Sequence, residues 1–228
     1  MKILLLCDDY WHPGDVPTNG VKPLESQGYT FDIISDGGDF CPSMLKNYPV
    51  VMLCKCNQKS QADDSAWMTA EVQQAFVDFV ENGGGLLVVH SGTVPSETTE
   101  MMSRLIGCRF TFHPNRCPVT VAPILPHPVT DGVGMFCEVD EHYRLEILSD
   151  DVKAIIASYS AEQGEKDKYE EDPYHNATAW ISAAGLVRTQ GKGRVCVLTP
   201  GHIIEVWQNT QFQKTLANAI DWCGEVHI

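Results

Sequence analysis

The sequence predicts an α/β fold in which helices cover a mostly parallel sheet. Residues 3–7, 50–54 and 86–89 are uninterrupted apolar segments, which is the pattern of strands buried on both faces. Between Thr69 and Glu81 the apolar residues recur at helical spacing, and Asn82-Gly83-Gly84-Gly85 ends this helix because glycine tolerates the left-handed conformation at a C-cap. Strand and helix signals that alternate in this way favour a parallel sheet.

The other elements follow in chain order. Residues 31–35 predict a further strand, which ends at the turn Asp36-Gly37-Gly38-Asp39. Residues 101–106 close a helix before Gly107, residues 110–120 and 123–128 are expected to be irregular, and residues 152–158 and 195–199 are strands. The last helix carries an apolar face made of Phe212, Leu216, Ala219, Ile220 and Cys223.

The chain is expected to form one domain over residues 1–228, because it contains no internal repeat and no dividing linker. Residues 161–176 carry most of a charge cluster without an apolar period, so we expect a solvated, mobile loop there.

Composition excludes several classes of protein. With 16 basic and 30 acidic residues the net charge is −14, and so acidic a surface repels nucleic acid. Apolar stretches fall short of the ~18 residues of a membrane span, and the first one ends at Asp8-Asp9, too early for a signal peptide. The 9 cysteines lie mostly in apolar segments, which predicts core thiols in a cytoplasmic protein.

Candidate functional residues follow the predicted strands, since ligands bind beyond the carboxyl ends of parallel strands. Asp8, Tyr10, Trp11 and His12 follow the first strand, His90 and Ser91 the one at residues 86–89, and His202 the last. His113 lies in an apolar segment and needs a partner if it is buried. Of Asp140 and Glu141, one is expected to face the site and the other water.

These residues allow more than one chemistry. No contiguous metal-binding motif is present, yet His90, His113, Glu141 and His202 supply the nitrogen and oxygen ligands that suit zinc or a similar divalent ion. Ser91 as a nucleophile with His202 as its base is an alternative, although Ser91 lacks the glycines of a nucleophile elbow. His12 alternatively serves only to bond a turn before Pro13-Gly14.

No nucleotide cofactor is expected. The segment Gly191-Lys192-Gly193-Arg194 lacks the arrangement of a phosphate-binding loop and favours a tight turn before the last strand.

Seven short segments together resemble the ThuA-like proteins, which are named for trehalose utilisation and share the class I glutamine amidotransferase-like fold. They span nearly the whole chain, and they are residues 83–90, 110–114, 127–132, 140–143, 179–180, 191–195 and 200–202. The resemblance implies a flavodoxin-like three-layer α/β/α sandwich. His90-Ser91 occupies the turn where an amidotransferase has its cysteine, so glutaminase activity is not implied.

The resemblance implies a role in the metabolism of disaccharides or other glycosides, including their keto derivatives. We expect a sugar-modifying enzyme, an isomerase, lyase or hydrolase, in which His90, His113, Glu141 and His202 are catalytic. A zinc or manganese ion held by His90, His113 and His202 would be its electrophile. Asp8, Tyr10, Trp11, His12 and Ser91 are the expected substrate contacts, with Tyr10 and Trp11 as a stacking wall for the sugar.

The alternative is a non-catalytic sugar-binding or regulatory protein on the same scaffold, because a fold does not dictate function. In either case the expected partner is a small-molecule sugar or glycoside, and a homo-oligomer is a common state for proteins of this size.

Overall fold

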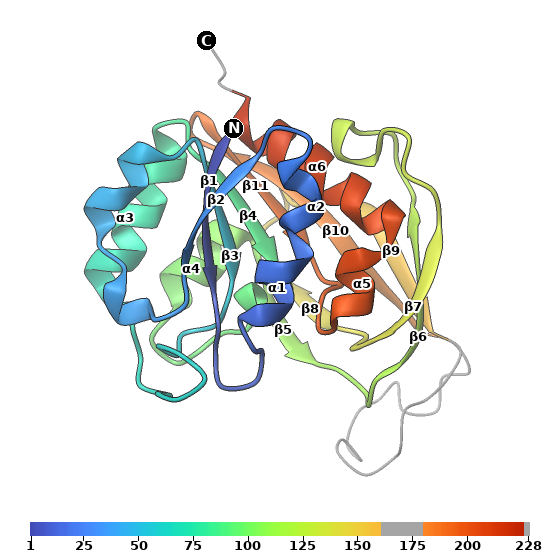
Figure 1. The fold of residues 1–228 in the computed structure, drawn as a ribbon, viewed down its shortest axis with the longest axis horizontal. Helices are drawn as coiled ribbons and strands as arrows, with labels where there is room; N and C mark the ends of the chain where they lie inside the picture. Colours follow the sequence, from blue (N-terminus) through green and yellow to red (C-terminus); the bar gives the residue numbers. More distant parts are fainter. Residues whose placement is uncertain (161–179, 226–228) are drawn as a thin grey trace.

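A nine-stranded sheet forms the centre of the structure (Figure 1), a computed structural model that describes residues 1–160 and 180–225. In spatial order its strands are β2 (Thr30–Ile34), β1 (Lys2–Cys7), β3 (Val50–Cys54), β4 (Gly85–Val89), β11 (Gly193–Leu198), β10 (Trp180–Gln190), β9 (Lys153–Ser160), β6 (Cys117–Pro123) and β7 (Phe136–Asp140). A separate antiparallel pair consists of β5 (Cys108–Phe112) and β8 (Arg144–Ile147).

In the spatial series β2-β1-β3-β4-β11 each strand runs parallel to the next, as predicted. In the register of β1, Leu5 lies between Ile33 on β2 and Met52 on β3. Beyond β11 each neighbouring pair is antiparallel, so that only β10 and β6 run against the other strands. The protein is therefore a mixed α/β fold with a large, mostly parallel sheet.

Helices lie against the sheet, and the side chains of β1 show why both faces need cover. Leu5 packs into a core with helices α1 (Asp15–Gly20), α2 (Lys22–Glu25), α5 (Ile204–Gln208) and α6 (Thr210–Gly224). Leu4 and Leu6 point the other way, into a second core with α3 (Ala70–Glu81) and α4 (Glu100–Ile106). Successive side chains of a strand point to opposite faces, so an unbroken apolar strand feeds two cores.

The helix boundaries follow the sequence signals. The Thr69 side chain accepts a hydrogen bond from the backbone N–H of Val72, which caps α3 at its first turn. Gly107 follows α4 with a φ of 84°, a left-handed conformation that glycine adopts without strain.

Two predictions of irregular structure were wrong in part. Residues 110–120 contribute to β5 and β6, and residue 123 is the last residue of β6. The prolines obscured a period of two, in which Cys117, Val119 and Val121 are buried. Pro118 precedes the part of β6 that pairs with β9, a position near a strand end where proline is tolerated.

The charged segment 161–176, expected to be a loop, lies outside the described residues. All nine cysteines are free thiols. Within residues 1–160 and 180–225, none of the helices has the length and apolar character to cross a membrane.

Candidate metal centre at the carboxyl end of the sheet

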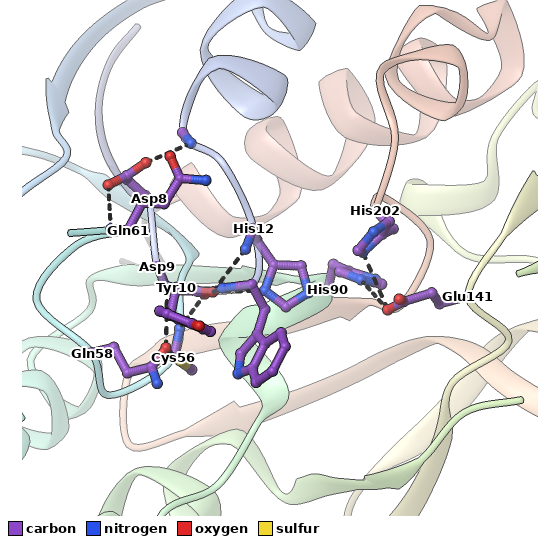
Figure 2. Close-up of polar contacts among 12 residues, drawn as sticks. Asp8, Asp9, Tyr10, His12, Cys56, Gln58, Gln61, His90, Glu141 and His202 are labelled. Carbon is purple, nitrogen blue, oxygen red and sulfur yellow. Dashed lines mark hydrogen bonds and ion pairs between the residues drawn. The ribbon is translucent and has the colours of Figure 1, made fainter. Parts of the chain in front are cut away.

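Four side chains converge where strands β1, β4, β7 and β11 end. His12 lies in the loop after β1, Glu141 directly follows β7, and His202 lies in the loop after β11. His90 is the first residue after β4, in the short 3-10 helix η3 (His90–Thr93), and has a φ of 47°, in the left-handed region that residues other than glycine rarely adopt. One ligand atom from each of the four lies within 4.8 Å of the others. Figure 2 shows three of the rings and the carboxylate facing one another.

One carboxylate oxygen is the focus of this cluster. Glu141 Oε2 lies 3.2 Å from His202 Nδ1, 3.3 Å from His90 Nε2 and 3.4 Å from His113 Nε2. The rings of His12, His90 and His202 surround the same space, with centroids 5.0, 5.2 and 5.4 Å apart. Steep angles between the ring planes, 78°, 81° and 64°, let three imidazole edges point inward together.

These separations fit a bound divalent ion better than they fit hydrogen bonds. A tetrahedral ion with bonds of about 2.0–2.1 Å holds its ligand atoms about 3.3–3.4 Å apart. His90 Nε2, Glu141 Oε2 and His202 Nδ1 are all buried, and none has a hydrogen-bond partner among the described residues. A buried polar atom without a partner is costly, so three of them facing one another are better suited to binding a metal ion than to remaining unpaired.

The outward nitrogen of two histidines is fixed by a backbone carbonyl. His90 Nδ1 donates to the carbonyl oxygen of Thr199 at 2.7 Å, and His113 Nδ1 donates to that of Pro114 at 2.8 Å. A carbonyl only accepts, so the proton lies on Nδ1 in both rings and Nε2 keeps its lone pair. That lone pair faces Glu141 in each case. The tautomer needed for metal ligation is therefore set by the backbone.

The outward nitrogen of His12 contacts the carboxylate of Asp9. The Asp9 side chain is fully buried, and its Oδ1 lies 2.8 Å from His12 Nδ1. The backbone N–H groups of Trp11 and His12 also donate to Oδ1, and the N–H of Cys56 donates to Oδ2. Burial would raise the pKa of Asp9, but the His12 imidazole and, after it, the backbone N–H groups of Cys56 and Trp11 hold that pKa at about 2.

Asp140 does not face water, as one of the Asp140-Glu141 pair was expected to do. Its carboxylate is 2% exposed and accepts the backbone N–H groups of Gly201 at 2.9 Å and of His202 at 3.1 Å. A buried carboxylate needs such donors, and the start of the His202 loop supplies them. Two consecutive residues thus contact the loop after β11. Asp140 binds the backbone of this loop, and Glu141 contacts the imidazole of His202.

The charges of the cluster are coupled. Burial would raise the pKa of Glu141, but the imidazoles of His202 and His90 outweigh it and hold that pKa well below its usual range. Burial lowers the pKa of His12 and that of His113. For His90 the neighbouring carboxylates outweigh burial, and its pKa is raised. Glu141 is therefore an anion, the form that a metal requires.

His113 lies at the edge of the cluster. It belongs to the predicted metal ligands, but it is not one of the four residues whose ligand atoms all lie together, and His12 takes that place. Its side chain is 23% exposed, against 4% for His90. Tyr143 packs between them, with its ring 4.0 Å from that of His90 and 5.6 Å from that of His113.

The predicted substrate contacts have different surroundings. Tyr10 and Trp11 are 52% and 66% exposed and form an edge-to-face pair at 4.8 Å beside His12. Ser91 is buried and lines a small cavity together with His12, His90 and His202.

Asp8 is turned away from the cluster in Figure 2 and instead accepts the backbone N–H groups of Gly14 and Gln61.

Sequence reasoning assigned no role to the residues that hold the ligands in place. Asp9, Asp140 and Tyr143 all adjoin predicted site residues, and each is buried. A sequence signal exists only for the carboxylates, because an acidic residue next to an apolar strand must find donors if it is buried.

The fold and the site define an α/β protein with a histidine- and carboxylate-lined centre at the carboxyl end of its sheet. A family model for ThuA, described as trehalose utilisation, matches residues 10–223. The chain therefore belongs to the ThuA family. No protein with a curated description matches the sequence.

Solved structures share the fold. A protein described as ThuA-like from Parabacteroides merdae is 18% identical with a TM-score of 0.72, covering 100% of this chain and 92% of its own. Another from Bacteroides uniformis is 20% identical with a TM-score of 0.69, covering 98% and 91%. The β-galactosidase of Rahnella sp. R3 is 13% identical with a TM-score of 0.61, covering 96% of this chain and 31% of its own. At these identities the likeness concerns the fold alone.

Proposed function

We propose that this protein is a metal-assisted enzyme that acts on a sugar or glycoside carrying a carbonyl group. The observation that carries the proposal is the trio of buried, unpartnered atoms His90 Nε2, Glu141 Oε2 and His202 Nδ1 at the spacing of metal ligands. Membership of the ThuA family supports a carbohydrate-related role.

The proposed ligands are His12, His90, Glu141 and His202, and zinc and manganese both accept such a set. A divalent ion bound there would polarise a carbonyl oxygen and so acidify the neighbouring C–H bond. One carboxylate among the ligands leaves the bound ion with a net positive charge, which suits it to an anionic oxygen.

His113 is the proposed base. Its Nε2 carries a lone pair because Nδ1 is bonded to Pro114, and its side chain is the most exposed of the histidines around Glu141. Burial lowers its pKa, so the ring is neutral near pH 7 and can accept a proton.

The Tyr143 hydroxyl is the proposed hydrogen-bond donor to a developing oxyanion. It lies 3.4 Å from His12 Nε2, and its ring is buried against His90. Burial and the nearby carboxylates hold the pKa of Tyr143 well above its ordinary value, so the phenol keeps its proton. A protonated phenol can stabilise negative charge on an enolate oxygen.

Tyr10 and Trp11 are proposed to contact the sugar ring. They are exposed large aromatics in the loop that carries His12. Aromatic rings that are apolar on their faces and polar at one end suit the mixed surface of a sugar. The class I glutamine amidotransferase-like sandwich is proposed as the fold type, supported by the two cores on opposite sides of the sheet.

Hydrogen exchange at carbon tests the proposal without knowledge of the product. The protein loaded with Zn²⁺ or Mn²⁺ is incubated in D2O with disaccharides and their keto derivatives, and NMR follows the C–H next to the carbonyl. We expect deuterium to enter at that carbon with wild-type protein and not with the His113→Ala variant. Sugar binding without exchange or product would favour the non-catalytic alternative instead.

A further inference from the structure

The contacts of Asp9 single it out among the carboxylates near the site. It follows β1 by two residues and is fully buried, yet it receives four hydrogen bonds from the described residues. Three of these hydrogen bonds come from backbone N–H groups, and a neutral acceptor in the same position could also accept them. The fourth joins Oδ1 to His12 Nδ1 at 2.8 Å and acts on the imidazole itself.

We infer that Asp9 is a positioning residue that keeps the proton of His12 on Nδ1 and so turns the Nε2 lone pair toward the centre. An ionised carboxylate only accepts hydrogen bonds, so the Nδ1 that faces it must carry hydrogen. The ring of a neutral histidine then has its lone pair on the opposite nitrogen. The effect of this role on metal affinity rests on the proposed function. The position of the ring proton does not, because it follows from the contact with Asp9 alone.

Asp9 also links two loops. Its Oδ1 binds the loop after β1, while its Oδ2 receives the N–H of Cys56 from the loop after β3. The carboxylate is therefore tied on both sides, and its plane is fixed relative to the sheet. Among the histidines that face the centre, His90 and His113 obtain the same tautomer from carbonyl oxygens, and only His12 depends on an ionisable side chain for it.

An Asp9→Asn variant separates these functions. An asparagine presents one acceptor and one donor. If its oxygen faces His12, its NH₂ group meets the Cys56 N–H. If its NH₂ group faces His12, it donates to Nδ1 and moves the ring proton to Nε2. The second orientation moves the tautomer, whereas the first keeps it and replaces the Cys56 hydrogen bond with a repulsive contact between two donors, so each orientation loses part of the wild-type arrangement.

Asp8→Asn is the matched control. Asp8 is the preceding carboxylate, and it too accepts backbone N–H groups from two loops, at Gly14 and at Gln61. Neither of these hydrogen bonds involves a histidine, and the carboxylate points away from the centre (Figure 2). General damage to the loops should therefore appear in both variants, whereas loss of the tautomer should appear in Asp9→Asn alone.

The test uses metal-free, 15N-histidine-labelled protein and two-bond 1H–15N correlation spectra recorded over a range of alkaline pH, so that each ring is followed into its neutral form. A His12→Gln variant assigns the His12 signals. We expect the Nδ1–H form of His12 in wild type and in Asp8→Asn, and a shift toward the Nε2–H form or a mixture in Asp9→Asn. The signals of His90 and His113 should keep the Nδ1–H pattern throughout, as internal references.

Metal affinity supplies the second measurement. Competition with a chromophoric chelator should show Zn²⁺ affinity about 10–100-fold lower for Asp9→Asn and within about twofold of wild type for Asp8→Asn. An Nε2–H tautomer of His12 in wild type would overturn the inference, and this result does not depend on how the variants fold. Equal losses of affinity in the two variants would also overturn it. Failure of wild type to bind metal would contradict the proposed function but leave the tautomer experiment decisive.

Discussion

Glu141 Oε2 and His202 Nδ1 lie 3.2 Å apart, although the two residues are 61 positions apart in the sequence. The strands that they follow, β7 and β11, have three other strands between them in the sheet. Asp140 binds the backbone N–H of the same histidine. The end of an outer antiparallel strand thus closes over the loop of a central parallel strand. This contact brings the antiparallel half of the sheet into the candidate site.

The His113→Ala variant should still bind the metal ion but should no longer catalyse carbon–hydrogen exchange. His113 lies outside the group of four ligands but carries an accessible lone pair. We expect metal content within about twofold of wild type and at least about a 100-fold loss of carbon–hydrogen exchange, the usual scale for removal of a general base. Elemental analysis and NMR exchange on one preparation measure both. Loss of the metal in this variant would assign His113 to the coordination sphere instead.

Trp11→Ala should weaken sugar binding without affecting the fold. The side chain is 66% exposed, so its removal leaves no cavity, and the free energy of unfolding should change by less than about 0.5 kcal/mol. Loss of an aromatic contact should lower sugar affinity about tenfold, which corresponds to about 1.4 kcal/mol. Calorimetric titration with the sugar that shows exchange measures this. An unchanged affinity would remove Trp11 from the binding surface.

Gly201→Ala should damage both stability and metal binding. Gly201 has a φ of +140°, and an added Cβ would lie 3.3 Å from Trp207 Nε1. We expect a destabilisation of about 1–3 kcal/mol from backbone strain, together with displacement of His202 and weaker metal binding. Denaturant unfolding and chelator competition are the measurements.

Gly28→Ala is the control for that experiment. Gly28 also has a positive φ, of +90°, but an added Cβ there would meet no atom within 4 Å. The Gly28→Ala variant should lower the free energy of unfolding through backbone strain alone and leave metal affinity unchanged. Equal metal affinity in the two variants would show that the Gly201 turn does not position His202.

Tyr29 should make the protein less stable at alkaline pH. Burial and the hydrogen bond to Asp221, at 2.9 Å, raise its pKa to about 12. The unfolded chain releases this proton near pH 10, so the stabilisation is complete below about pH 10 and is lost as the pH rises toward 12. Because the Asp221 partner is near solvent, we expect a loss of roughly 1–2 kcal/mol.

The Tyr29→Phe variant isolates this effect. It removes the hydroxyl and keeps the ring, so the decline of unfolding free energy between about pH 10 and 12 should be shallower than in wild type. Denaturant unfolding across this range measures the difference. Identical slopes for the two proteins would show that Tyr29 ionises normally in the folded state.

The parallel half of the fold could be predicted from sequence, whereas in the antiparallel half only β9, expected at residues 152–158, was predicted as a strand. Strands such as β3 and β4 are buried on both faces, so composition alone reveals them. In β6 and β7 the alternation is short and interrupted, as at Pro118, and pairing with distant β9 decides the structure. Long-range pairing of this kind has no local signal.

The candidate site shows the same division. His90 and His202 follow strands that the sequence predicts, and the rule for strand ends placed them together correctly. Glu141 follows β7, a strand that was not predicted, and its place in the site came from the resemblance and its chemistry. The sequence also could not tell Asp8 from Asp9, because a φ of 72° at Asp8 decides which carboxylate turns inward.

Metal content is the most direct test of the account. Untagged protein, purified without chelator, is compared with its His90→Ala variant by elemental analysis, and both are then titrated with Zn²⁺ and Mn²⁺ after dialysis against a chelator. We expect about one divalent ion per wild-type chain, restored on titration, and little or none in the variant. Wild-type protein that takes up neither ion, or a variant that binds as much as wild type, would contradict it.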